Sequence, residues 1–310
     1  MRKTAFAVTD VPTISQGETM DAKCLSVVVP TFNEEEIIGQ CLTRLTEQLD
    51  HILEIIVVDN NSTDATVDIV RSFADRFSEV ILVSEERQGL VYARNTGLDA
   101  ATGPAISRID SDTLVPPGWA ETIVDFLHSD TEKRWAALCG RGEAYGLPYG
   151  DSIGNLKKRV GLLRPPRTTK NTVKDVPVLY GSNMTLRRET WLEVRDKVSM
   201  RRDVFEDVDC GLCVQESGGR NAFLAHLTVG VSPRRMETSI RGFVTYMLCL
   251  PRTLLLHKRF ALAAAAATIY LPAITILHTG RLVIIRSYDK ETGRFSARNI
   301  LRASIDRAMP

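Results

Sequence analysis

The chain has 310 residues, enough to bury a substantial core as one large domain or two small ones. Its 39 basic and 38 acidic residues leave a net charge of +1, so no broad basic surface is expected and nucleic acid is excluded as a partner. Six cysteines are scattered without the dense spacing of a secreted disulfide framework, which favours a reducing, cytoplasmic compartment.

The first part of the chain alternates between two kinds of apolar pattern. Residues 1–24 are predicted to be a flexible leader, because polar residues interrupt the apolar core that a signal peptide needs. The predicted strands are residues 25–29, 54–58, 80–83 and 105–109, and the predicted helices are residues 34–49, 63–77 and 88–101. This alternation predicts an α/β fold with a mostly parallel central sheet and helices on both faces.

The second half of the chain is less regular. We predict helices over residues 116–127 and 205–217, strands over residues 135–139 and 222–231, and a long loop over residues 164–177. From residue 236 onward the pattern is helical. The sequence therefore predicts one domain over residues 25–235 and a helical extension over residues 236–310.

Residues 260–280 form an uncharged run between Lys258-Arg259 and Arg281. A membrane span needs about 20 apolar residues, so the length is sufficient. The many alanines are weakly hydrophobic, and Pro272 and His278 interrupt the run. Two alternatives stay open: a buried helix broken at Pro272, or contact with a membrane surface at the inner face of the cell membrane.

Polar residues follow three of the predicted strands, where ligands bind in open α/β sheets. Thr31, Asn33 and Glu34 follow the first strand, and a stretch from Asp59 to Asp64 follows the second. Asp110 and Asp112 follow the fourth, and two carboxylates in this spacing suit Mg²⁺ or Mn²⁺ beside a diphosphate. The alternative for this pair is a plain turn.

Two further side chains are expected at the same edge. Turn and capping preferences explain most of the stretch after the second strand, but a carboxylate at Asp59 needs a partner that a nucleoside would supply. Arg94 lies on a predicted helix from which it can reach phosphate or sugar oxygens, with an arginine exposed to solvent as the alternative. The run GLVYARNTG around it contains no phosphate-binding glycine motif, which weighs against a dehydrogenase or a P-loop protein.

Arg234 and Arg235 follow the last predicted strand. They are candidates for closing over a diphosphate, and contact with a membrane surface or solvent is the alternative. Cys210 and Cys213 have the spacing of half a zinc site, but without a second pair we interpret them as buried helix residues. The five histidines show no ligand spacing and receive no role.

Four motifs in order, VVVPTFNEEE, VVDNNSTDAT, GLVYARNTG and RIDSDT, resemble those of the family 2 glycosyltransferases. The resemblance is close from residue 25 to about residue 125 and continues through GSNM at Gly181 and FEDVD at Phe205. It implies a nucleotide-diphospho-sugar transferase fold, with a nucleotide-binding half at residues 25–125 and an acceptor half at residues 126–235. It also implies transfer with inversion at the anomeric carbon.

The same resemblance assigns roles to individual residues. Asp207 would be the general base for the acceptor hydroxyl, with Glu206 beside it as a second catalytic residue, and Asp110 and Asp112 would hold the metal and the diphosphate. The alternative for Asp207 is capping of the helix that follows. The remaining residues expected to bind substrate, apart from the two arginines above, are Pro30, Thr31, Phe32, Glu34, Asp59, Asn61, Arg94, Gly181 and Asn183.

The leading hypothesis is therefore a metal-dependent enzyme that moves one sugar from a nucleotide-diphospho-sugar to a hydroxyl acceptor. The acceptor is a glycan, a lipid-linked molecule or a small molecule, and Asn60-Asn61 leaves the nucleotide base open. A single transfer is expected because the Q-x-x-R-W motif of processive synthases is missing. The alternatives are a non-catalytic nucleotide-sugar-binding protein and a sugar-nucleotide nucleotidyltransferase.

Overall fold

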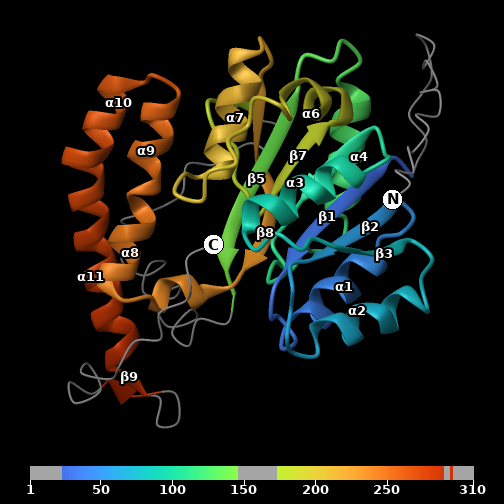
Figure 1. The fold of residues 1–310 in the computed structure, drawn as a ribbon, viewed down its shortest axis with the longest axis horizontal. Coiled ribbons are helices and arrows are strands. Elements are labelled where there is room, and N and C mark those ends of the chain that lie inside the picture. The colour runs from blue at the N-terminus through green and yellow to red at the C-terminus, as the bar shows by residue number, and fades with distance from the viewer. Residues whose placement is uncertain (1–22, 146–172, 290–293, 296–310) are drawn as a thin grey trace, which may run out of the picture.

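The computed structural model describes residues 23–145, 173–289 and 294–295, and the described chain is built around one large sheet (Figure 1). Parallel pairs dominate this sheet, while β7 and β6 run antiparallel to their neighbours. The predicted fold class is confirmed, whereas the predicted leader lies almost wholly outside the described residues. From edge to edge the strands are β3 (Val80–Ser84), β2 (Ile52–Asp59), β1 (Leu25–Thr31), β4 (Ala105–Arg108), β7 (Met184–Arg187), β5 (Ala137–Ala144), β8 (Asn221–Val231) and β6 (Val173–Val176).

Helices cover both faces of the sheet because successive strand residues point to opposite sides. Val27 and Val29 of β1 belong to the core on one face, and Val28 belongs to the core on the other. The first core is closed by α1 (Ile38–Thr46), α2 (Thr66–Ala74) and α4 (Trp119–Ser129). The second is closed by α3 (Leu90–Ala100), α6 (Arg188–Val194) and α7 (Glu206–Glu216).

Helix α3 lies close to the sheet because of a glycine. A Cβ atom added at Gly97 would clash with the side chains of Val28 and Val58, so only glycine permits this approach. Arg94 lies three residues earlier on the same helix. The close approach therefore fixes where the guanidinium of Arg94 lies relative to the strand ends.

Three elements differ from the sequence prediction. Part of the predicted loop over residues 164–177 forms the edge strand β6, whose Lys174 and Asp175 are typical of protected sheet edges. Strand β7 and helix α6 were not predicted. Both are short, and four residues such as those of β7 carry too little periodicity to identify a strand.

The C-terminal part is helical as predicted, up to residue 287. It begins with the short 3₁₀ helix η1 (Pro233–Glu237) and ends with a two-stranded hairpin. Between them lie α8 (Ile240–Met247), α9 (Cys249–Leu256), α10 (Phe260–Ala265), the π-helical turn η2 (Ala266–Tyr270) and α11 (Leu271–Ser287), and the closing strands are β9 (Tyr288–Asp289) and β10 (Arg294–Phe295).

The expectation of a buried helix broken at Pro272 is wrong. Phe260–Ser287 forms one continuous helix of 28 residues, and only 11% of its most apolar window is buried. The π-helical turn directly precedes Pro272 and changes the hydrogen-bond pattern where proline lacks an N–H group. By length and composition this helix is able to cross a membrane, with a mean hydropathy of 2.0.

Candidate active site

The loops that follow β1 and β2 are tied together by hydrogen bonds. The Asn33 side-chain oxygen accepts from the Thr63 backbone N–H at 2.8 Å, and the Ser62 hydroxyl accepts from the Asn33 N–H at 3.0 Å. The Glu34 N–H donates to the Thr66 hydroxyl at 2.8 Å. These bonds make the two predicted donor-binding loops a single unit at the carboxyl edge of the sheet.

Within this unit Asp59 already has a partner. Its carboxylate accepts from the backbone N–H of Ser62 at 3.2 Å, so the turn itself supplies a partner, and contact of Asp59 with a nucleoside stays a prediction. Asn61 adopts φ of 65° and donates to the Glu86 carbonyl at 2.9 Å. Asn60 is buried, and its side-chain oxygen accepts from Gly89 at 2.8 Å. The turn therefore organises the start of α3 as well as the strand end.

The residues expected to line the base pocket lie at the end of β1. Pro30 and Thr31 are buried in the strand, whereas the Phe32 ring is 44% exposed just beyond it. The Thr31 hydroxyl is buried and finds no hydrogen-bond partner within residues 23–145, 173–289 and 294–295. Glu34 follows and forms an ion pair described below.

A network of charges links the end of β4 to the start of α7. Arg94 is 4% exposed, donates to Asp110 Oδ1 at 2.7 Å, and forms an ion pair with Glu206. The guanidinium of Arg108 lies 3.5 Å from the same Glu206 carboxylate. The alternative of a solvent-exposed Arg94 is wrong, and Glu206 has its charge balanced by two arginines.

Arg108 is a site residue that the sequence analysis missed. It is 2% exposed as the last residue of β4, and its Nε donates to the Gly181 carbonyl at 3.2 Å. Burial, helped by the nearby charge of Arg94, lowers the pKa of Arg108 to about 10, so it stays charged at neutral pH. A cation inside an otherwise apolar strand, two residues before Asp110, was the available signal.

Asp207 lies beside this network with a fixed carboxylate. Its Oδ2 accepts from the Gly181 N–H at 2.8 Å, and its Oδ1 accepts from the Val208 N–H at 2.9 Å. A Cβ at Gly181 would meet the end of the Arg108 side chain and lie 3.2 Å from Asp207 Oδ2, so any larger residue would displace the Arg108 guanidinium. The N-cap residue of α7 is Phe205, and Asp207 lies in the first turn, so stabilisation of the helix start stays open as the structural alternative for Asp207.

A second ion-pair group lies at Asp112. One guanidinium nitrogen of Arg234 donates to Asp112 Oδ2 at 2.8 Å and to Glu34 Oε2 at 2.7 Å. Arg234 belongs to η1, which directly follows β8, and its Nε donates to the Ser232 hydroxyl at 3.0 Å. The side chain of Arg235 lies outside the described residues.

Asn183 has a structural environment. Its side chain is 1% exposed, accepts from the Trp119 indole at 3.0 Å, and donates to the Leu227 carbonyl at 3.0 Å. These bonds hold β7 against β8 and α4. Asn183 therefore has a structural role, and its contact with substrate stays a prediction.

The carboxylates of Asp110 and Asp112 offer oxygen ligands of the kind that a divalent cation takes. Both follow the end of β4, and each carries an oxygen that faces a guanidinium, Arg94 in one case and Arg234 in the other. Carboxylate oxygens, which here pair with the two guanidinium groups, are also the hard ligands that Mg²⁺ and Mn²⁺ prefer. Neighbouring arginines also suit a diphosphate.

Comparison with known proteins identifies the family. The sequence model described as Glycosyl transferase family 2 matches residues 26–191, which is more than half of the chain. The chain belongs to glycosyl transferase family 2. The family resemblance inferred from the four sequence motifs is thereby confirmed.

Relatives of this family 2 chain match over part of their length. It is 34% identical over 113 residues to the putative glycosyltransferase EpsH of Bacillus subtilis, covering 36% of this chain and 33% of that protein. It is 32% identical over 135 residues to the PGL/p-HBAD biosynthesis glycosyltransferase of Mycobacterium bovis, covering 43% of this chain and 48% of the relative. These alignments span less than half the length of the relatives.

A solved structure shares the fold of this family 2 chain. The mannosyltransferase PcManGT from Pyrobaculum calidifontis, in complex with GDP-Man and Mn²⁺, has a TM-score of 0.52 and 24% identity. The similarity covers 83% of this chain and 79% of that one. It supports the nucleotide-sugar transferase fold.

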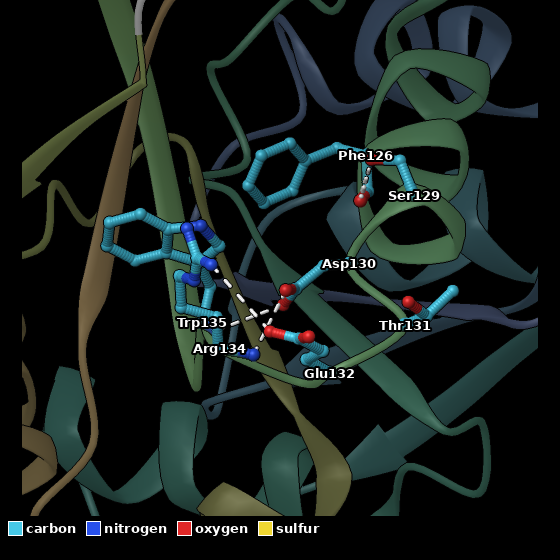
Figure 2. Close-up of a pocket in the computed structure, with 7 residues that line it drawn as sticks. All are labelled: Phe126, Ser129, Asp130, Thr131, Glu132, Arg134 and Trp135. Carbon is cyan, nitrogen blue, oxygen red and sulfur yellow. Dashed lines mark hydrogen bonds and ion pairs between the residues drawn. The ribbon is translucent and has the colours of Figure 1, made fainter.

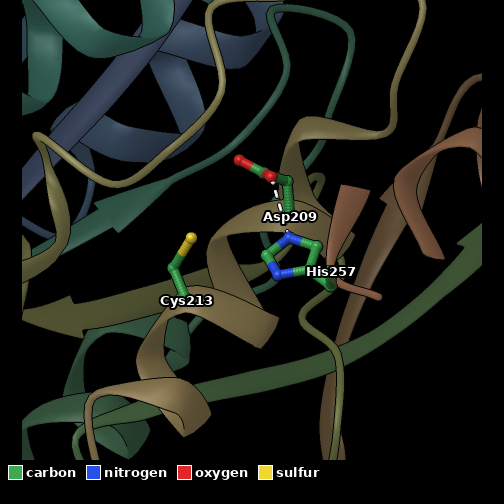
Figure 3. A group of neighbouring side chains, drawn as sticks. All are labelled: Asp209, Cys213 and His257. Atoms are coloured by element: carbon green, nitrogen blue, oxygen red, sulfur yellow. Dashed lines mark hydrogen bonds and ion pairs between the residues drawn. The ribbon is translucent and has the colours of Figure 1, made fainter. Parts of the chain in front are cut away.

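A polar group joins α7 of the family 2 domain to the C-terminal helices. His257, at the end of α9, bonds Asp209 Oδ1 at 2.9 Å (Figure 3). Its other ring nitrogen bonds Glu216 Oε2 at 3.0 Å. Ligand atoms of Asp209, Cys213 and His257 lie within 4.8 Å of one another. Burial raises the pKa of Cys213 to about 12, so its thiol is protonated. The sequence analysis gave His257 no role, and the structure makes it a joint between helices.

A shallow pocket beyond the end of α4 lies apart from the ion-pair groups described above. Figure 2 shows Asp130 and Trp135 among its lining residues. The Asp130 carboxylate accepts from the Trp135 N–H at 2.9 Å and from Arg187 at 3.0 Å. These bonds explain Asp130 as a structural corner between α4 and β5.

Proposed function

We propose that this chain transfers one sugar from a nucleotide-diphospho-sugar to a hydroxyl acceptor, with inversion at the anomeric carbon. The observation that carries the proposal is the Arg94 bridge, which holds Asp110 of the candidate metal pair against Glu206, the neighbour of Asp207. One guanidinium thus links the candidate metal pair to the residue that precedes the candidate base. The complex of a mannosyltransferase of similar fold with GDP-Man and Mn²⁺ supports the choice of ligands.

Asp110 and Asp112 would hold the divalent cation. When bound, it supplies positive charge to the departing nucleoside diphosphate. Arg234 lies beside Asp112 and is positioned to bind a phosphate oxygen once it leaves that carboxylate. The loops after β1 and β2 would hold the nucleoside, with the exposed Phe32 ring available for stacking.

Asp207 would take the proton from the acceptor hydroxyl. Backbone donors at Gly181 and Val208 hold both carboxylate oxygens in place, and each oxygen keeps a second lone pair that is able to accept a proton. Glu206 is clamped by Arg94 and Arg108 and therefore positions α7. The proposed role of Glu206 is to hold α7 in place and not to act directly in catalysis.

We also propose that the exposed C-terminal helix contacts the inner face of the cell membrane. The support is its continuous length of 28 residues and its low burial.

The test is a thermal-shift panel of UDP-, GDP- and dTDP-sugars with and without Mn²⁺, followed by measurement of nucleoside diphosphate release and of sugar transferred to acceptors. A ligand that binds the folded state raises its apparent stability. We expect one donor to stabilise the protein in the presence of Mn²⁺, and Asp112→Asn to abolish most of that shift and of the release. Asp68→Asn, at an exposed helix position, is the matched control. A protein that binds a donor but never releases product would support the non-catalytic alternative.

A further inference from the structure

The C-terminal helices form a hairpin, defined here as residues 240–287, that stands beside the sheet (Figure 1). Its inner side packs on the transferase domain through a buried cluster in which Val208 and Leu212 of α7 meet Leu254, Ala263 and Ala266. Its outer side is apolar and exposed. The large apolar side chains exposed there are Ile240, Leu255, Leu256, Phe260, Leu262, Ile269, Tyr270, Ile276, Leu277, Val283 and Ile284.

The charge of the hairpin has one sign. Residues 238–288 contain no Asp or Glu, although the whole chain has nearly equal numbers of acidic and basic residues. Arg252 and Arg259 lie 4.0 and 3.9 Å from carboxylates of the domain, so their charges are only weakly balanced. The basic residues of the hairpin are Arg241, Arg252, Lys258, Arg259, Arg281 and Arg286.

This combination selects an anionic lipid surface over a second copy of the chain. Two hairpins packed together would bring their basic residues near each other with no carboxylate of their own to offset the charge. Anionic headgroups supply that countercharge, and acyl chains accommodate the apolar outer side. The uncharged stretch of residues 260–280, with basic residues at both ends, has the pattern of a lipid-facing segment.

The docking of the hairpin decides how it meets the lipid. Its tip is held on α7 by the buried bond between His257 and Asp209, and the Phe205 N–H donates to the Thr253 hydroxyl at 2.8 Å. If residues 260–280 crossed the hydrocarbon layer in this arrangement, the carboxylates of α7 would enter it as well. Burying charges in hydrocarbon is costly, so a spanning position is disfavoured.

The candidate base lies next to the contact between α7 and the hairpin. Val208, in the hairpin contact, directly follows Asp207, and Tyr180 directly precedes Gly181, which binds Asp207. The Tyr180 ring is 48% exposed. It packs edge-on against Phe223 of β8, with ring centroids 6.0 Å apart.

We propose that the hairpin lies along the surface of an anionic membrane without crossing it, and holds Asp207 beside the lipid for a lipid-borne hydroxyl acceptor. The acceptor part of this inference rests on the proposed function of Asp207. The membrane part does not, because it depends only on the hairpin.

Vesicle flotation of the full chain tests the surface. We expect binding to phosphatidylglycerol-containing vesicles and at least tenfold weaker binding to pure phosphatidylcholine. The double variant Ile269→Glu/Ile276→Glu should bind the vesicles at least tenfold more weakly. The control Leu192→Glu, at an exposed position of α6, should bind them as the wild type does. The proposal is overturned if the double variant floats with the vesicles as well as the wild type does. It is also overturned if the wild type binds no vesicles and is instead a dimer that the double variant separates into monomers.

Site-specific labels test the orientation without any measurement of transfer. Single cysteines that replace the exposed Lys258 and Arg281 should both react with a membrane-impermeant maleimide added outside the vesicles. The native cysteines in the described chain are buried and should not react. Protection of one of them would show a spanning helix and refute the proposal. A fluorophore at Tyr180→Cys should be quenched by headgroup spin-labelled lipid at least twofold more than one at Ile81→Cys, on the opposite sheet edge. Equal quenching at the two positions would refute the claim that the acceptor side lies beside the lipid. The thermal-shift panel of nucleotide sugars tests the proposed chemistry separately.

Discussion

Asp207→Asn separates catalysis from structure, because the carboxylate is held at both oxygens. Gly181 donates to one oxygen at 2.8 Å and Val208 donates to the other at 2.9 Å. Asparagine has one acceptor oxygen and one amide group, so at one of these two bonds a donor would face a donor. Leaving one such bond unmade costs about 1–3 kcal/mol of folding free energy. Loss of a general base lowers the transfer rate by roughly 10²-fold or more.

Glu206→Gln is the matched comparison, and we expect it to lose folding stability with a much smaller loss of transfer rate than Asp207→Asn. Its charge offsets those of Arg94 and Arg108, and its side chain is 21% exposed. Breaking a fully buried pair costs roughly 3–5 kcal/mol, and partial exposure reduces this to about 3 kcal/mol or less. The assay measures transfer rate, donor affinity and urea denaturation for both variants at a temperature where each is folded. An Asp207→Asn enzyme that transfers at the wild-type rate would refute the role of Asp207 as base.

Three further predictions follow from contacts in the domain. Arg234→Gln should tighten Mn²⁺ binding, measured by titration with paramagnetic detection, because a guanidinium 2.8 Å from Asp112 repels a cation there; unchanged affinity would show that the two do not compete. Hydrogen bonds from Arg87 and Thr96 lower the pKa of Glu85 from its usual 4.5 to about 2, so the stability it contributes is present above pH 4.5 and is lost as the pH falls toward 2. Glu85→Gln should therefore show a flatter loss of stability over that pH range in denaturant titrations, and an identical slope would contradict the assignment. Gly97→Ala should lower the urea midpoint, with a cost of about 1–3 kcal/mol from overpacking against the sheet, and a wild-type midpoint would mean that α3 moves away without penalty.

The sequence by itself determined the alternating part of the fold and the local half of the candidate site. Apolar runs such as residues 25–29 specify buried parallel strands, because side chains on both faces must be apolar. Residues that follow such strands reach one edge of the sheet whatever the later topology. For this reason the places of Thr31, Asp59 and Asp110 followed from their positions alone.

Tertiary structure decided which partner each charged group has. Arg234 and Glu34 lie 200 residues apart in the sequence, and no local pattern brings them together. The pairing of Glu206 with Arg94 and Arg108 likewise depends on how α7 lies across the sheet. Such contacts form only when distant segments dock, and composition carries no information about which segments do so.

The same limit applied to residues 260–280. Their composition was compatible with a buried helix and with a lipid-facing one, because both are apolar. The exposure of the outer side in the folded chain contradicts the buried helix. That exposure depends on which neighbour covers the helix, so it follows from packing between distant segments and not from the residues of the helix alone.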